Sequence, residues 1–203
     1  MSKIILDRLK DKFGADVLET SSFRGDEVAL ISLARWREAA EFVKTDPRCA
    51  CDYFVDLSVV DRCDPTSDEL DMEDRFEVYV IAHSLTKKHR VRLKTRVSGA
   101  DPRCPTLTSV WKGADWMERE AWDMFGVRFE GHPDLRRILM YEEFEGHPLR
   151  KDYPANRAHP LVAYREGTHD KLGPFLADEG MPINRSPSVD DRPNAAPRGT
   201  DSN

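Results

Sequence analysis

Apolar residues recur at helical spacing in two stretches near the beginning of the chain. In residues 4–13 they are Ile5, Leu9 and Phe13, with Gly14 next, and in residues 35–44 they are Trp36, Ala39, Ala40 and Val43. Positions three or four residues apart lie on one face of a helix, and glycine is a frequent helix stop. The pattern therefore predicts two short amphipathic helices.

A different period, alternation of apolar and polar residues, marks the stretches between and after these helices. It occurs in residues 17–23, 27–33, 53–59, 75–84 and 89–97. Alternation is the signature of a strand with one buried face. Arg24-Gly25-Asp26 separates the first two stretches as a hairpin turn, and a polar turn around Thr86 to Lys88 separates the last two. His83 and His89 flank that second turn and are expected on the surface.

A third helix is predicted from Thr106 or Thr108, both competent N-caps, to Phe125, with Gly126 ending it. Its core stripe is formed by Leu107, Val110, Ala114, Met117, Ala121 and Phe125. The other faces carry Trp111, Trp116 and Trp122 among Asp115, Glu118, Arg119, Glu120 and Asp123. Three tryptophans exceed what one core stripe needs, so at least one is expected to face a partner.

This order of elements predicts an α+β fold, in which helices pack on a mostly antiparallel sheet of about four or five strands. Three regions are expected. Residues 1–130 form the α+β domain, residues 131–185 an extended partner-binding arm, and residues 186–203 a disordered tail. The tail is rich in proline and lacks periodic apolar residues, a composition typical of disorder.

Composition narrows the class of protein. The 203 residues carry a net charge of −6, which argues against a nucleic-acid binder, because such proteins usually present a basic face. No apolar run approaches the length of a membrane span. The beginning of the chain has no apolar signal segment and carries Asp7, Asp11 and Asp16, unlike a transit peptide. We therefore expect a soluble protein that works in the compartment where it is made.

Local motifs for catalysis or cofactor binding are missing from the sequence. There is no nucleophile elbow, P-loop, dinucleotide-binding glycine turn or zinc-protease helix. Cys49, Cys51, Cys63 and Cys104 contain no C-x-x-C pair, so reduced, packed thiols are expected rather than a metal or cluster site. The acidic stretch 61–74 lacks the glycine and final glutamate of a calcium loop and is expected to be a solvated loop.

The tripeptide Gly-His-Pro occurs twice, at residues 131–133 and 146–148. His132 and His147, with Asp134 and Glu145, are acceptable metal ligands, but each histidine precedes a proline that favours extended backbone. The alternative is a strap that lies across another surface. Its apolar anchors would be Leu135, Ile138, Leu139, Met140, Tyr141 and Phe144, and its cations Arg136, Arg137, Arg150 and Lys151.

The stretch EREAWDMFGVRFEGHPDLRRIL, residues 118–139, closely resembles the defining motif of the 30-kDa (C-type) subunit family of the proton-pumping NADH-quinone oxidoreductase, respiratory complex I. GHPLRKDYP, residues 146–154, resembles the family's continuation, whereas the chain departs from many relatives after Pro154. The resemblance implies a non-catalytic peripheral-arm subunit that packs chiefly against the large, D-type subunit of the quinone module. It also implies that flavin, iron–sulfur clusters and quinone are bound by other subunits, while the complex passes electrons from NADH to quinone and translocates protons.

The location implied is the cytoplasmic face of the bacterial inner membrane, reached through the complex. The partner surface is expected to comprise Trp116, Arg119, Glu120, Asp123, Arg136, Arg137, Arg150 and Lys151. Two alternatives stay open from the sequence. One is the equivalent subunit of a membrane-bound hydrogenase or of a ferredoxin- or F420-dependent dehydrogenase. The other is a self-standing metal-dependent enzyme that uses His132 and His147.

Overall fold

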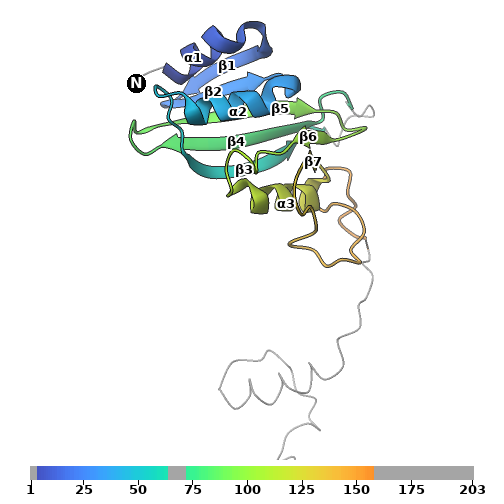
Figure 1. Ribbon diagram of the computed structural model, residues 1–203. Helices are drawn as coiled ribbons and strands as arrows, with labels where there is room; N and C mark the ends of the chain where they lie inside the picture. Colours follow the sequence, from blue (N-terminus) through green and yellow to red (C-terminus); the bar gives the residue numbers. More distant parts are fainter. Residues whose placement is uncertain (1–3, 64–71, 158–203) are drawn as a thin grey trace, which may run out of the picture. The chain divides into compact units, whose positions relative to one another are not determined.

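A five-stranded sheet forms the centre of the computed structural model, which describes residues 4–63 and 72–157 (Figure 1). Its strand order is β1-β2-β5-β4-β3, with β2 and β5 parallel and every other neighbouring pair antiparallel. The expected α+β fold with a mostly antiparallel sheet is confirmed. The strands are β1 Val17–Phe23, β2 Asp26–Ile31, β3 Tyr53–Asp61, β4 Phe76–Ser84 and β5 His89–Val97.

Two helices, α1 (Ile4–Phe13) and α2 (Trp36–Thr45), cover one face of this sheet (Figure 1). Their apolar stripes meet the inward-facing positions of the strands, as in β4, where every second side chain from Phe76 to Ser84 is buried. Trp36 is fully buried in this core. Burial of a large apolar side chain contributes about 1.5–3 kcal/mol, so these stripes supply much of the driving force for folding.

The third helix, α3 (Ala114–Phe125), lies beside β3 and begins later than the sequence predicts (Figure 1). Residues 107–113 form turns instead, closed by bonds from Val110 N–H to the Leu107 carbonyl and from Ala114 N–H to the Trp111 carbonyl. Leu107 and Val110 are buried all the same. Tight turns therefore bury the apolar residues that the sequence places on a helix, and Thr106 and Thr108 are not helix caps.

A short parallel pair, β6 (Arg103–Pro105) and β7 (Arg128–Glu130), joins the two ends of the α3 region. The Thr106 N–H extends the pairing by donating to the Glu130 carbonyl at 3.0 Å. Three-residue strands show no readable alternation, so the sequence does not reveal this pair. It brings the turns at 106–113 and the segment that starts at Gly131 to the same side of α3.

Residues 131–157 contain no helix or strand, yet they belong to the same compact unit as the sheet. The boundary expected after residue 130 therefore does not separate an independent arm over the part that the structure describes. Residues 158–185 of the expected arm and the expected tail, 186–203, lie outside the described residues. Within 4–63 and 72–157, no helix combines the length and the apolar character that crossing a membrane requires.

Candidate protein-interaction site

Helix α3 carries the residues that the sequence singles out, and its end is fixed by a glycine. Gly126 adopts a φ of 76°, in the left-handed region, and donates its N–H to the Trp122 carbonyl at 2.8 Å. A Cβ at this position would also collide with the side chains of Arg150 and His147. Glycine is therefore required both for the backbone angle and for the close approach of residues 147–150 to the helix end.

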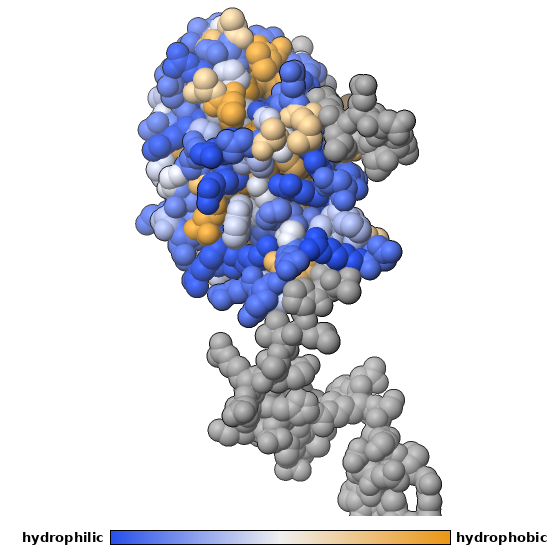
Figure 2. All heavy atoms as spheres, turned by 90° about the vertical axis from the view of Figure 1, so that its right-hand side faces the viewer, coloured by the Kyte–Doolittle hydropathy of each residue, from blue (hydrophilic) through white to orange (hydrophobic). Residues whose placement is uncertain are grey.

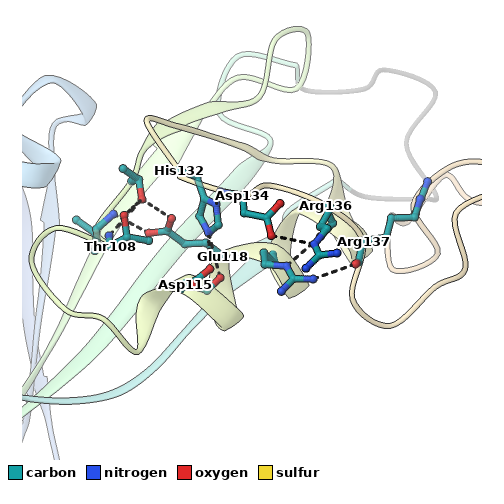
Figure 3. Close-up of polar contacts among 10 residues, drawn as sticks. Thr108, Asp115, Glu118, His132, Asp134, Arg136 and Arg137 are labelled. Atoms are coloured by element: carbon teal, nitrogen blue, oxygen red, sulfur yellow. Dashed lines mark hydrogen bonds and ion pairs between the residues drawn. The ribbon is translucent and has the colours of Figure 1, made fainter.

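Glu118 lies on the inner side of α3, where it ties the preceding turns to the helix (Figure 3). Its carboxylate accepts bonds from the Thr106 hydroxyl and the Leu107 N–H, both at 2.6 Å. Burial raises the pKa of this carboxyl group to about 7, although the two donors oppose the shift. The sequence places Glu118 on a charged outer face, which is wrong. The spacing of four residues from Ala114 puts it on the core stripe instead.

Asp123 is fully buried and holds the backbone of the following segment against α3. One oxygen accepts the N–H groups of Ile138, Leu139 and Met140 at 3.1, 2.9 and 2.8 Å. The other accepts Arg137 Nη1 at 2.6 Å. Burial by itself would raise the pKa of this carboxyl group, but the four donors together hold it below its usual range. The expectation that Asp123 faces a partner is wrong, because its own chain binds both of its oxygens in the interior.

Two of the four strap cations are bound inside the fold. Arg137 reaches Asp123 and also donates to the Gly146 carbonyl at 3.0 Å. Arg150 donates from Nε to the Phe125 carbonyl at 2.6 Å and lies over the ring of Phe76. Burial, followed by the nearby Arg75 charge, lowers the pKa of Arg150.

The bonds of these two arginines differ from the expected partner contact. The carbonyls at the end of a helix have no partner within the helix and carry partial negative charge. The Phe125 carbonyl at the end of α3 binds Arg150 in this way, whereas Arg137 is bound by the Asp123 carboxylate and the Gly146 carbonyl. Both guanidinium groups are therefore bound within the chain itself.

A buried ion cluster fixes the end of the segment to the sheet. Arg75 donates to Asp61 at 2.9 Å and to Asp152 at 2.7 Å, and both Arg75 and Asp61 are almost completely buried. Asp61 also accepts the Lys151 N–H at 2.9 Å. Hydrogen bonds from Arg75 and from the backbone hold the pKa of Asp61 below its usual value despite its burial. The side chain of Lys151 itself is exposed.

The two histidines bind opposite ends of α3 and do not form a metal site. His132 accepts the Asp134 N–H at Nδ1, and its Nε2 donates to the main-chain carbonyl of Asp115 at 3.1 Å (Figure 3). His147 donates from Nδ1 to the Asp123 carbonyl at 2.9 Å. Among the described residues, no three His, Cys, Asp or Glu side chains converge as metal ligands would. Each Gly-His-Pro unit therefore anchors one end of the segment to the helix.

What remains on the outside is a compact surface of mixed character, which we call the α3 surface: Trp116, Arg119, Glu120, Arg136 and Leu139. Trp116 is 60% exposed, and the Arg119 guanidinium lies 5.6 Å from its ring centroid. Arg119 also donates to the carbonyls of Arg136 and Arg137 at 3.2 Å, so it joins the helix to the segment (Figure 3). Whether a partner contacts these residues stays a prediction.

The character of this surface is consistent with protein contact. Leu139 is 56% exposed, and the side chain of Arg136 is 69% exposed and pairs with the neighbouring Asp134. The face on the right of Figure 1 is mostly hydrophilic, with apolar patches set among hydrophilic residues (Figure 2). A large aromatic residue ringed by charge on a rigid helix is the composition of an interface hot spot.

The four cysteines lie in the interior of the part of the chain that the structure describes. All four are free and buried. Burial raises the pKa of Cys49 and of Cys51 to about 12, so both are thiols at neutral pH rather than the thiolates that bind metals.

Comparisons with known proteins agree with this picture. A family model described as the respiratory-chain NADH dehydrogenase 30-kDa subunit matches residues 29–159. The chain is 44% identical over 156 residues to the second C-type subunit of the NADH-quinone oxidoreductase of Rhizobium meliloti, covering 77% of this chain and 76% of that one. It is 37% identical over 189 residues to the corresponding subunit from Rhizobium etli, covering 93% and 91%.

Two solved structures resemble the fold. One is described as Nqo5, a trypsin-resistant fragment, with 27% identity, a TM-score of 0.53, and coverage of 64% of this chain and 99% of that one. The other is a chain of the membrane-bound sulfane sulfur reductase, an archaeal respiratory membrane complex. It has 20% identity, a TM-score of 0.61, and coverage of 76% and 86%. At that identity the second likeness shows a shared fold alone.

Proposed function

The chain belongs to the family of the respiratory-chain NADH dehydrogenase 30-kDa subunit, and on that premise we propose that it acts structurally and docks through its α3 surface. As the 30-kDa subunit of NADH-quinone oxidoreductase, it has other complex I subunits as partners and no active site of its own. The specific neighbour that we propose is the large, D-type subunit of the quinone-reducing module.

The observation that carries this proposal is the exposure of Trp116 on helix α3, whose two ends are held by hydrogen bonds from His132 and His147. Exposed tryptophan is costly in water but is enriched at interface centres, where its truncation costs about 2 kcal/mol or more. Here the Arg119 guanidinium lies 5.6 Å from the ring centroid, and Arg119 is fixed by two backbone carbonyls. A partner would therefore meet a preformed surface and lose little conformational entropy on binding.

We place the electron carriers on other subunits. Flavin, iron–sulfur clusters and quinone would then be bound by chains next to this one, which would move no electrons. The buried, protonated thiols of Cys49 and Cys51 support this proposal, because a cluster needs thiolate ligands that a metal can reach. The contribution of the chain to electron transfer and proton translocation would be to hold neighbouring subunits in position.

The proposed location is the cytoplasmic face of a bacterial inner membrane, as a peripheral subunit attached through the complex. Contact with other subunits rather than with lipid would then hold the chain at the membrane. The net charge of −6 supports this, because an acidic protein is repelled by the anionic surface of a bilayer.

Replacing Trp116 with alanine tests the proposal. We expect the Trp116→Ala chain to fold normally, because the ring is largely exposed, and to be lost from the assembled complex on native gels at least tenfold more readily than the parent. The matched control is Leu18→Ala on β1, since Leu18 is also 60% exposed but lies away from the α3 surface. Equal incorporation of the two variants, with unchanged melting temperatures, would remove the α3 surface from the proposed interface.

A further inference from the structure

A large open hollow lies at one end of the sheet and has no role in the docking proposed above. Four segments surround it: the first residue of α1, the β1–β2 turn, the α2–β3 connection and the β4–β5 turn. Its volume is about 980 Å³, at the upper end of the ~300–1,000 Å³ that ligand sites usually occupy. The chain therefore offers a second concave surface that can receive another molecule.

Positive charge dominates the rim of this hollow. Arg24, Arg48, Lys87 and Lys88 all line it, and none of them takes part in an ion pair among the described residues. Arg90 also lines it but is paired with Asp26 at 2.5 Å. Four uncompensated cations at one place on a chain of net charge −6 create a local field that attracts anions.

Two of these cations occupy costly backbone positions. Arg24 and Lys88 have φ values of 52° and 56°, in the left-handed region that glycine and asparagine adopt with less strain. Within the described part of the chain, Ala50 is the only other non-glycine residue there, with φ 46°, and it belongs to the α2–β3 connection beside the hollow. The two turns thus place cations at the rim at the expense of local stability, a feature that clusters at binding sites.

The remaining lining residues decide which kind of anion fits. The buried Glu27 carboxylate already accepts the Leu6 N–H at 3.3 Å at the start of α1, so a negative charge stands where a compact phosphate would bind this helix end. Ile4, Val55 and Ile81 add apolar surface to the same hollow. Cations spread over separate turns around an apolar floor match an extended acidic segment that also carries an apolar side chain.

This hollow and the end of the 131–157 segment lie at opposite ends of β4. Arg75, next to the first residue of β4, binds Asp152, whereas His83, near its last residue, lines the hollow. The nine residues of β4, at about 3.3 Å each, separate the two ends by roughly 25–30 Å. We propose that the hollow binds an acidic, apolar-bearing segment of another subunit, at a site whose lining includes no residue of the α3 surface. This inference rests on the proposed function, because it assumes that the chain works within the complex.

Carbodiimide cross-linking of the intact, detergent-purified complex tests the inference, because this reagent joins an amine to a carboxylate that is already in contact with it. We expect mass spectrometry to find Lys87 or Lys88 joined to an aspartate or glutamate of a different protein in the complex. A cross-link to an acidic residue of this chain would overturn the proposal. So would lysines that are acetylated as readily in the complex as in the isolated chain. Shielded lysines that form no cross-link and become reactive on delipidation would overturn it in favour of a lipid headgroup.

A double variant checks that the rim cations hold the partner. Arg24→Gly with Lys88→Gly removes two charges and relieves both left-handed positions, so the isolated chain should melt at or above the parent temperature. In the complex, the cross-link at Lys87 should fall at least threefold, while Lys10→Ala, an exposed cation on α1, should leave its yield unchanged. An undiminished yield in the double variant would contradict the inference. Native gels separate this outcome from a failure of the proposed function. If the chain is present in the complex but the cross-link is undiminished, only the inference about the hollow fails, whereas the docking at Trp116 is tested by incorporation itself.

Discussion

Replacing Asp123 with asparagine should destabilise the protein more than Arg137→Gln, which removes the charge of its ion-pair partner. The carboxylate accepts three backbone N–H groups and the Arg137 guanidinium in a fully buried position. Asparagine keeps one accepting oxygen but turns an NH₂ group toward donors. Arg137 then loses its carboxylate, and at least one N–H of the 138–140 backbone loses its acceptor.

The magnitude follows from which groups are left unpaired. Breaking a buried ion pair by removing one partner costs roughly 3–5 kcal/mol, and the side chain of Arg137 is only 14% exposed. Arg137→Gln is milder, because Asp123 keeps three N–H donors that still stabilise its charge, and losing one hydrogen bond to a charged group costs about 1.5–3 kcal/mol. In a chain of this size, 3–5 kcal/mol corresponds to a fall of roughly 6–20 °C in melting temperature. Judged by the middle of the two ranges, Asp123→Asn should therefore cost roughly 1–2 kcal/mol more than Arg137→Gln.

Urea unfolding of the isolated chain at pH 7 measures both variants, with Glu142→Gln as the control because Glu142 is an exposed acid of the same segment. The control should stay within about 0.5 kcal/mol of the parent. The folded pKa of Asp123 is lowered, so its stabilisation is present above its unfolded pKa, about 3.9, and is lost as pH falls through the folded pKa. Asp123→Asn cannot titrate at this position, so its free energy of unfolding should fall less than that of the parent as the pH is lowered. Equal costs for the two variants would refute the reasoning that Asp123 organises the segment.

Two further predictions follow from the same helix. Because the folded pKa of Glu118 is raised to about 7, its contribution to stability is fully present below the unfolded pKa of about 4.3 and is lost as pH rises through about 7. Glu118→Gln should flatten the stability profile over that range, and an unchanged slope in urea unfolding would show that another group causes it. Gly126→Ala should cost several kcal/mol, and clearly more than Gly14→Ala, because both positions have positive φ but only Gly126 has side chains where a Cβ would stand. Equal melting temperatures of these two alanine variants would contradict the close approach of residues 147–150.

The sheet and the first two helices could be predicted from the sequence because their patterns are local. The bounds of α1, β1 and β5 are those that the spacing of apolar residues predicts. In these elements one face is buried and the other is solvated, so the period of the sequence reports the period of the backbone. β2 ends at Ile31, earlier than expected, because Leu33 begins a 3₁₀ turn.

The α3 region resisted prediction because its polar residues are satisfied by contacts distant in sequence. Nothing near Asp123 in the sequence indicates that it will bind backbone groups 15 to 17 residues later. Likewise, a run of arginines has the same appearance whether its partners are in another protein or in the preceding helix. Glu118 is the exception, since its spacing from Ala114 and Ala121 places it on the buried stripe. Charge alone suggested a surface position, and spacing is the stronger guide.

The repeated Gly-His-Pro unit shows why internal bonding favours docking. Each histidine binds one end of α3, at Asp115 and Asp123, and each glycine takes a positive φ that the turn requires. The segment between them is thereby held along the helix before any partner arrives. A free strap would lose backbone and side-chain entropy on binding, about 1–2 kcal/mol for each backbone residue that is ordered. Because this chain orders the segment during its own folding, the energy of contact at Trp116 and Leu139 can go into association.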